Sequence, residues 1–232
     1  MSNFKIYFLY HSGFIVELEH TILVFDYFQD PCDKMSEVLE SGKTIYFLVS
    51  HVHHDHFNPG IKNFENKASG YFIHSDCRLP LRNTDHLHIM DVGDSYAGNG
   101  ISVKMYGSTD AGGSYVVEAE GHTFFHAGDL NWWHWAGESD WENREARDAF
   151  FKELNRIKER KADIAFIPVD ARQQVAREWG VKKYLERLDT DLLIPMHAFG
   201  QRWVPSYEFT WLYPDQKIWI PEEPGDVYKG NL

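Results

Sequence analysis

The stretch Ser50-His51-Val52-His53-His54-Asp55-His56 follows the apolar run Thr44-Ile45-Tyr46-Phe47-Leu48-Val49 and precedes Phe57-Asn58-Pro59-Gly60. The apolar run predicts a buried strand, because β-branched and aromatic residues favour pleated, covered surfaces. Five of the seven residues after it are imidazoles or carboxylates, which can bind or orient a metal ion. Core packing does not explain so many hydrated side chains directly after a buried strand. The stretch therefore predicts a metal site at a strand end.

The spacing within the stretch divides its side chains between two cations. His51 and His53 project to the same side of an extended segment, so both imidazoles can reach one cation. Asp55 and His56 lie one turn further on and are expected to face a second cation, about 3.5–4 Å away as in two-metal hydrolases. His54 points elsewhere by the same parity. This donor set suits zinc, with manganese or iron as alternatives.

The pattern H-x-H-x-D-H after a strand resembles the signature of the metallo-β-lactamase superfamily. The resemblance implies later ligands at strand ends, namely a bridging Asp in a G-D pair and a last His. Phe124-Phe125-His126-Ala127-Gly128-Asp129 and Leu193-Ile194-Pro195-Met196-His197 match these in order and spacing, and the match spans essentially the whole chain. Asp129 is therefore expected to bridge both metals, and His197 to bind the second.

The family's third His is missing from this sequence. Its expected place is the turn Gly107-Ser108-Thr109-Asp110-Ala111-Gly112-Gly113, where Thr109 stands immediately before Asp110. Three alternatives follow: Asp110 supplies an oxygen ligand, water fills the position, or the first metal binds weakly. A fourth role for Asp110 is to stabilise the turn through its own backbone.

Other histidines near the motifs are expected to support the site or the fold. Tyr10-His11-Ser12-Gly13-Phe14-Ile15 resembles the opening strand pair of the superfamily, and Asp26 would end the third strand near the site. His11 is expected to support the ligands or the fold rather than to bind metal. His126 is a candidate outer donor that orients a ligand. No chemistry is predicted for His74, His86 or His88.

Aromatic and basic residues beside the motifs are candidates for contact with substrate. Trp132 and Trp133 follow Asp129 closely and either pack a loop onto the core or form a substrate wall. Arg202 follows His197 and is a candidate contact for a phosphate or carboxylate.

Length and composition limit the class of protein. The chain has 232 residues and a net charge of −12, which argues against a general nucleic-acid or anionic-membrane surface. Only Cys32 and Cys77 are present, so no disulfide scaffold or cysteine-rich zinc ribbon is predicted, and a reducing cytoplasm is expected. Polar residues interrupt every early apolar run, so neither a signal peptide nor a spanning helix is predicted.

The order of the predicted elements favours an α/β (α+β) protein, a four-layer αββα sandwich of two facing mixed β-sheets flanked by helices, forming one domain over residues 1–232. Short runs within residues 4–25 predict an antiparallel meander, and residues 35–39 a short helix. An apolar stripe predicts a helix over 141–160, followed by a strand at 164–169. A helix capped by Asp170 is expected to bury Val175, Trp179 and Leu185. The segments 217–220 and 226–228 are expected as edge strands of the second sheet.

These motifs predict a metal-dependent hydrolase in which metal-bound hydroxide attacks a small ester, lactone or phosphodiester substrate. The expected ligands are His51, His53, Asp129 and Asp110 for one metal, and Asp55, His56, Asp129 and His197 for the other. Asp55 would also orient the nucleophile.

The resemblance is nearest to the branch with sugar-phosphate lactonases and N-acyl phospholipid phosphodiesterases. Alternatives are a nuclease of the ribonuclease Z kind, disfavoured by the acidic surface, and a metal-binding or sensory protein with little turnover. A flavodiiron oxidoreductase is disfavoured because the flavin domain is absent. Natural substrate, metal identity and oligomeric state stay open.

Overall fold

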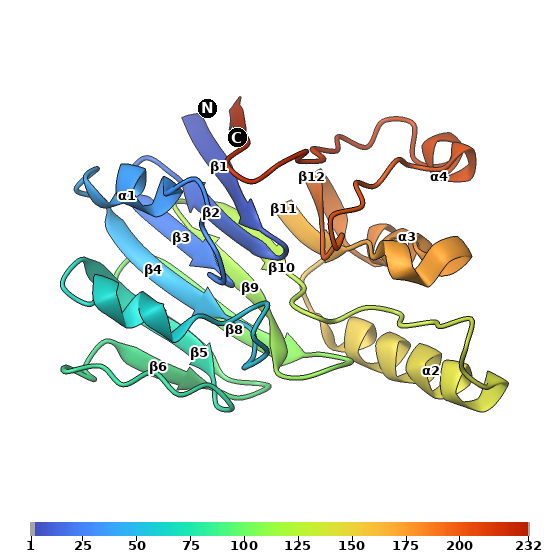
Figure 1. The fold of residues 1–232 in the computed structure, drawn as a ribbon, viewed down its shortest axis with the longest axis horizontal. Coiled ribbons are helices and arrows are strands. Elements are labelled where there is room, and N and C mark those ends of the chain that lie inside the picture. Colours follow the sequence, from blue (N-terminus) through green and yellow to red (C-terminus); the bar gives the residue numbers. More distant parts are fainter. Residues whose placement is uncertain (1–2, 232) are drawn as a thin grey trace.

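The first β-sheet is built mainly from the N-terminal part of the chain (Figure 1). The computed structural model describes residues 3–231, and seven strands form this sheet in the order β13-β1-β2-β3-β4-β5-β6. They are β1 (Asn3–Tyr10), β2 (Gly13–Glu17), β3 (Thr21–Phe25), β4 (Thr44–Val49), β5 (Ala68–His74), β6 (Leu87–Met90) and β13 (Val227–Asn231). The predicted meander is present as antiparallel β1, β2 and β3, whereas β3 to β6 pair in parallel.

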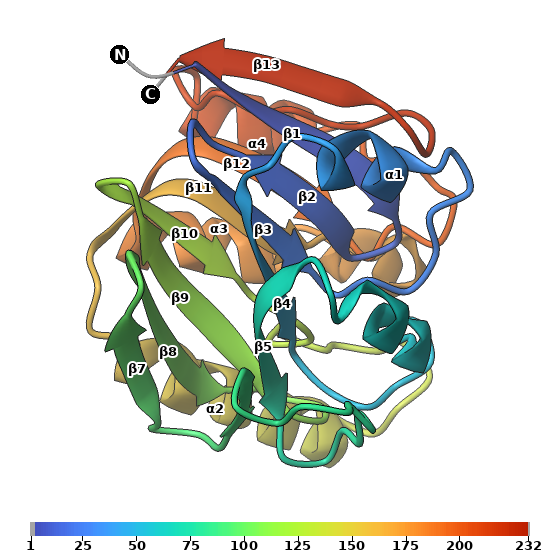
Figure 2. The ribbon, with the colours of Figure 1, turned by 90° about the vertical axis from the view of Figure 1, so that its left-hand side faces the viewer.

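The second β-sheet lies face to face with the first (Figure 2). Six strands form it in the order β12-β11-β10-β9-β8-β7. They are β7 (Ser95–Gly98), β8 (Ile101–Gly107), β9 (Gly113–Ala119), β10 (His122–His126), β11 (Lys161–Pro168) and β12 (Asp189–Met196). The pairs from β7 to β10 are antiparallel, and β10, β11 and β12 are parallel. Both sheets are therefore mixed, as predicted.

Helices cover the outer faces of both sheets (Figure 1). Those with six residues or more are α1 (Lys34–Leu39), η1 (Pro59–Phe64), α2 (Asp140–Arg156), η2 (Ala171–Ala176), α3 (Trp179–Arg187) and α4 (Tyr207–Leu212). Met35 of α1 and Ile61 of η1 pack on the first sheet, while α2 and α3 contact the second. Helix α2 begins at a capping box, in which Ser139 and Glu142 bond each other's backbone N–H groups. The four-layer αββα sandwich is confirmed.

The main core fills the space between the sheets. Phe166 of β11 lies against Phe14 of β2 and Phe25 of β3, with ring centroids 4.7 and 5.6 Å apart. All three rings are fully buried. Burying a side chain of this size stabilises the fold by roughly 1.5–3 kcal/mol, so these contacts fix one sheet against the other. Among residues 3–231, no helix is both long and apolar enough to cross a membrane.

Two predictions about the C-terminal half need correction. The last strand, β13, pairs with β1 of the first sheet and not with the second sheet. Within the described part of the tail, Ile218 forms an isolated bridge to Leu193 of the second sheet. The single helix expected after Asp170 is two short elements, η2 and α3, and Gln174 within η2 has a non-helical conformation with a φ of 52°. Val175 is consequently 86% exposed instead of buried.

Candidate metal centre

The candidate metal centre lies where strands of both sheets end. The loop after β4 supplies four of its side chains, β10 leads to Asp129, β12 leads to His197, and β1 leads to His11. Nitrogen and oxygen atoms of these residues form two sets, each within 4.8 Å of one another. The first ligand group is His51, His53 and Asp129, and the second ligand group is His11, Asp55, His56 and His197. Side chains from positions 11 to 197 thus meet in one place.

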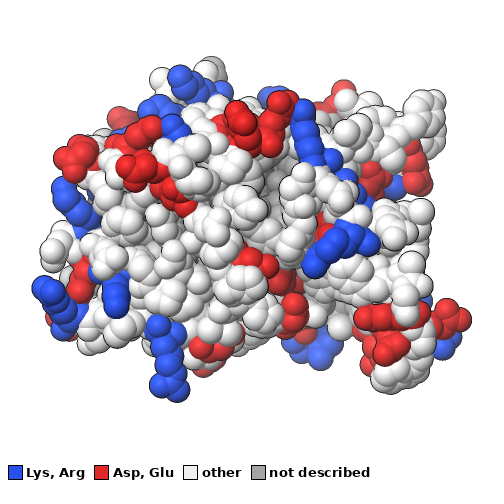
Figure 3. Space-filling model, viewed as in Figure 1, with Lys and Arg blue, Asp and Glu red and all other residues white. Residues whose placement is uncertain are grey.

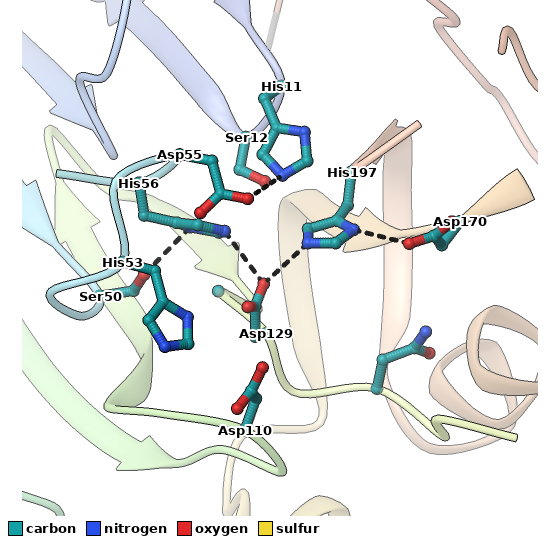
Figure 4. A network of polar contacts seen from close by, with 12 residues as sticks. His11, Ser12, Ser50, His53, Asp55, His56, Asp110, Asp129, Asp170 and His197 are labelled. Carbon is teal, nitrogen blue, oxygen red and sulfur yellow. Dashed lines mark hydrogen bonds and ion pairs between the residues drawn. The ribbon is translucent and has the colours of Figure 1, made fainter. Parts of the chain in front are cut away.

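Asp129 lies between the two groups (Figure 4). Its Oδ1 is 3.1 Å from His56 Nε2 and 3.4 Å from His197 Nε2, whereas its Oδ2 is 3.4 Å from His51 Nε2. One carboxylate therefore presents a separate oxygen to each group. Gly128 makes this approach feasible, because its φ is +52° and a Cβ there would lie 2.7 Å from the Gly113 carbonyl oxygen.

The electrostatics of the cluster favour positive charge at its centre. Burial alone would lower the pKa of His56, but the carboxylates of Asp129 and Asp26 raise it to about 10. Burial alone would raise the pKa of Asp129, yet His56, His51 and His197 hold it well below its ordinary value. The ionised carboxylate and the protonated imidazole stabilise each other here. A divalent cation would satisfy the same carboxylate.

Unpaired buried atoms provide a test of whether a metal fits. His56 Nε2, His11 Nε2 and Asp129 Oδ1 are buried and form no hydrogen bond, although the first and third lie only 3.1 Å apart. Leaving such atoms unsatisfied is costly, so native proteins rarely do it without a partner. Neutral imidazole nitrogens and carboxylate oxygens are ordinary ligands of zinc, iron and manganese. The residues present therefore fit divalent cations.

Carboxylates brace the imidazoles of the second ligand group. Asp26, fully buried after β3, contacts His56 Nδ1 at 2.7 Å and accepts from the Ser50 backbone N–H at 2.7 Å. Asp170, after β11, contacts His197 Nδ1 at 3.0 Å and is held in turn by Arg172. Burial alone would raise the pKa of Asp170, but His197 and Arg172 lower it to about 2. Such partners fix which ring nitrogen faces a metal.

The first ligand group is more open. His51 is fully buried and its Nδ1 lies 2.9 Å from Ser50 Oγ, but His53 is exposed. The glycine-rich turn packs tightly behind His51, because a Cβ on Gly112 would lie 2.4 Å from the His51 Cβ. Thr109, at the place of the missing His, bonds the backbone carbonyls of Asp129 and Asn131. It closes the turn instead of offering a ligand.

His11 belongs to the second ligand group, whereas the sequence predicted only a supporting role for it. Its Nε2 is 3.4 Å from Asp55 Oδ2, and its ring centroid is 4.2 Å from that of His197. Burial, together with His197 and His56, lowers the pKa of His11 to about 3. His11, Asp26 and His197 all have positive φ angles, of 56°, 41° and 61°. Strained conformations of this kind at three strand ends mark a functional site.

A cavity of about 540 Å³ opens over the cluster. Its walls include Trp133, which donates to the Asp129 carbonyl at 2.9 Å, and Trp135, which stacks on Trp133. Arg172 also lines it, with its guanidinium centred 3.7 Å from the Phe199 ring centroid. No sequence pattern predicted a site role for Trp135, Arg172 or Asp170, because their positions depend on packing between distant segments.

Three other candidate site residues lie outside the two ligand groups, and Trp132 and Arg202 also lie outside the cavity over the cluster. Trp132 packs against Phe151 and Trp179, away from this cavity, so a role as substrate wall is not expected for it. Arg202 is paired with Glu222 and lines a neighbouring cavity instead. Asp110 is exposed and lines the cavity over the cluster, but its carboxylate belongs to neither ligand group.

His126 and His54 lie close to the cluster without joining it. His126 is fully buried, its Nε2 is 2.9 Å from the Ser12 carbonyl oxygen, and its ring stacks on Phe25. Its Nδ1 is 3.8 Å from Asp26, so it supports the brace of His56 from behind. His54 is exposed, in agreement with the parity of the loop.

Comparison with solved structures agrees with this architecture. No protein-family model matches the sequence. The metallo-hydrolase Igni18 from the archaeon Ignicoccus hospitalis is 14% identical, with a TM-score of 0.59 over 99% of both chains. YhfI from Bacillus subtilis, described as a metallo-β-lactamase fold protein, is 12% identical, with a TM-score of 0.59 over 99% of this chain and 100% of that one.

A third similar structure has different chemistry. CmlA, a diiron β-hydroxylase from Streptomyces venezuelae, is 11% identical, with a TM-score of 0.58 over 100% of this chain and 54% of that one. Identities at this level show the fold alone. The chain has the metallo-β-lactamase fold, as the motifs from His51 to His197 predicted.

Proposed function

We propose that this protein is a hydrolase that holds two divalent cations, zinc in the first instance, and cleaves a small ester, lactone or phosphodiester. The observation that carries the proposal is the position of Asp129, whose Oδ1 faces His56 and His197 while its Oδ2 faces His51. A carboxylate shared in this way offsets part of the repulsion between two neighbouring cations.

Each side chain of the cluster has a proposed role. His51, His53 and Asp129 would hold one cation, and Asp55, His56, His197, His11 and Asp129 the other. When bound, such cations lower the pKa of water and polarise a carbonyl or phosphoryl oxygen. Asp55 is 23% exposed at the cavity, close to His11, and can accept a proton from the attacking water. Trp133 would form one wall against the substrate.

The two cations are proposed to bind with unequal strength. The second ligand group offers four side chains besides Asp129, and two of its imidazoles are braced by carboxylates. The first offers two imidazoles besides Asp129, one of them exposed. More ligands and better-oriented ligands bind a cation more tightly. We therefore propose a tight cation at the second group and an exchangeable one at the first.

We also propose that the protein works in a reducing compartment and acts on a small molecule. Cys32 and Cys77 are free, and Cys32 is exposed, which suits a reducing compartment such as the cytoplasm. On the face shown in Figure 3, basic side chains are scattered among acidic ones without a continuous basic surface. A nuclease needs a basic path for its polyanionic substrate, so a small-molecule substrate is favoured.

The test is a metal-reconstitution assay. Purified protein is stripped with a chelator, reloaded separately with zinc, manganese or iron, and assayed on p-nitrophenyl acetate, a γ-lactone and bis-p-nitrophenyl phosphate. The proposal expects hydrolysis of at least one substrate only after reloading. Tight cation binding without turnover on a broader panel would favour the metal-binding alternative. Oxygen consumption by the iron-loaded form without hydrolysis would instead favour oxidative chemistry.

A further inference from the structure

A second cavity, of about 620 Å³, adjoins the candidate metal centre. It lies between β1, the loop after β3, the loop after β12 and the segment that leads into β13. We call it the apolar chamber, defined by Phe8, Tyr10, Phe28, Met196, Trp203 and Ile220. Its volume is within the range of about 300–1,000 Å³ that small-molecule sites occupy.

The apolar chamber borders the metal centre and shares wall residues with the cavity over it. His11 and Asp55, both in the second ligand group, form part of its wall. Asp55, Arg172 and Phe199 line both this chamber and the cavity over the cluster. A single ligand can therefore place a polar group at the cluster and extend its remainder into the chamber.

The two arginines of the chamber, and Glu222, already have partners. Arg172 donates from Nε to Oδ1 and from Nη2 to Oδ2 of Asp170, and its guanidinium lies over the Phe199 ring. Arg202 pairs with Glu222, and these two side chains are 50% and 65% exposed. The remaining wall is mainly aromatic and aliphatic. A chamber with such walls and with its arginines already paired favours an uncharged, apolar occupant.

We propose that the apolar chamber binds an uncharged aliphatic group of several carbon atoms, attached to the group that the metal centre cleaves. The preferred substrate is then an ester, lactone or phosphodiester with an aliphatic chain. This inference rests on the proposed function for the position of the cleaved group. Binding of the chain itself does not require turnover, so the two proposals can fail separately.

The first experiment measures how tightly the apolar chamber binds aliphatic chains when no metal is present. Isothermal titration calorimetry follows 1-butanol, 1-hexanol, 1-octanol and 1-decanol binding to metal-stripped protein. Each buried methylene is expected to raise affinity about four-fold until the chamber is full. Affinity that does not change with chain length would overturn the inference, whether or not the protein is a hydrolase.

The second experiment links the chamber to the metal centre. Zinc-loaded protein is titrated with methyl-, butyl-, hexyl- and octylphosphonate, which cannot be hydrolysed. Affinity is expected to rise along the series from a measurable value for methylphosphonate. A gradient with alkanols but no binding of methylphosphonate would leave the chamber intact and count against the metal centre.

Two variants test whether the aliphatic chain of the ligand binds in the apolar chamber. Ile220→Trp adds bulk inside the chamber and is expected to end the gradient at a shorter chain, with methylphosphonate affinity unchanged. Val92→Trp places the same bulk at a position that is 49% exposed and outside the chamber, and serves as the matched control. Suppose that Ile220→Trp leaves the rise of affinity with alkyl length intact while Trp135→Ala removes it. The aliphatic chain of the ligand then binds over the metal cluster, and the inference is wrong.

Discussion

The two ligand groups of the candidate metal centre are built differently. The second group, His11, Asp55, His56 and His197, draws its imidazoles from three strand ends and braces two of them with buried carboxylates. The first group, His51, His53 and Asp129, draws both imidazoles from one loop, and His53 is exposed. At the place where the resemblance to the metallo-β-lactamase superfamily predicted a third His, Thr109 bonds backbone carbonyls instead.

This contrast shows that one edge of the sandwich can hold a rigid second ligand group beside a more open first ligand group. His11, Asp26 and His197 keep left-handed backbone conformations, which the packing of both sheets must sustain. Rigid, braced ligands favour retention of a cation, while an open group favours exchange and access for substrate.

The largest effect is expected from Asp129→Ala, because this side chain serves both groups. We expect both cations to be lost and hydrolysis to fall by at least about 1,000-fold. Metal analysis after gel filtration and the reconstitution assay measure the two effects. Asp163→Ala, at a carboxylate that bonds the Thr123 backbone N–H, is the control and should retain both cations. Full metal content in Asp129→Ala would remove the basis for a shared carboxylate.

The next effect separates the two groups directly. His56→Ala should remove the tightly held cation, because the imidazole lies between Asp26 and Asp129. His53→Ala should remove only the exchangeable cation and leave one per chain. Inductively coupled plasma mass spectrometry on dialysed protein gives the stoichiometry. If His56→Ala and His53→Ala lost the same amount of bound cation, the proposed difference in affinity between the two ligand groups would be wrong.

A smaller effect is expected from the brace of His197. Asp170→Asn keeps the shape but weakens the orientation of the imidazole, so cation affinity at the second group should fall about 10- to 100-fold. Competition with a chromophoric chelator measures the affinity. Glu153 belongs to neither ligand group and pairs with Arg156, so Glu153→Gln should leave the cation affinity unchanged. A similar loss in both variants would show that the effect is not specific to the brace.

Cation binding should also release protons in a pH-dependent way. The pKa of His56 in the metal-free protein is raised to about 10, so this imidazole is charged at pH 7.5 but must be neutral as a ligand. About one proton should leave per cation bound at the second group, detected by calorimetry in buffers of different ionisation enthalpy. Release should vanish above about pH 10.

The same raised pKa has a consequence for stability without metal. Because the charged form of His56 is stabilised by folding, its contribution is fully present below about pH 6.5 and is lost as pH rises through about 10. Urea unfolding of metal-stripped protein should show this loss. His56→Ala, which lacks the group, should show a weaker dependence between pH 8 and about pH 10.5.

The smallest effect is expected from Asp110→Ala. This carboxylate is exposed and belongs to neither ligand group, so cation affinity should change less than about three-fold. A chelator competition assay is sufficient. A loss comparable to that of His53→Ala would establish Asp110 as the substitute for the missing His and make the two groups more alike.

Much of this arrangement could be predicted from the sequence, because local patterns carry it. The apolar run before Ser50, the spacing of His51 to His56, and the later G-D and Met-His pairs located the strand ends where six of the clustered side chains lie. The sandwich of two mixed sheets followed from the order of strands and helices.

The remainder depends on tertiary packing that no local pattern records. His11 enters the second group because β1 runs in the same direction as β3 and its end adopts a left-handed turn. Asp170 meets His197 only through the pairing of β11 with β12. Trp132 and Arg202 were chosen for closeness in sequence, but their side chains turn toward α3 and toward Glu222.

The central claim is that the ends of β1, β4, β10 and β12 surround a divalent cation. Anomalous diffraction at the zinc edge, on crystals of zinc-loaded protein, tests this directly. The account predicts a strong peak among Asp55, His56, Asp129 and His197, with His11 beside it, and a weaker peak at His51 and His53. Zinc bound elsewhere, with no peak next to Asp129, would contradict it.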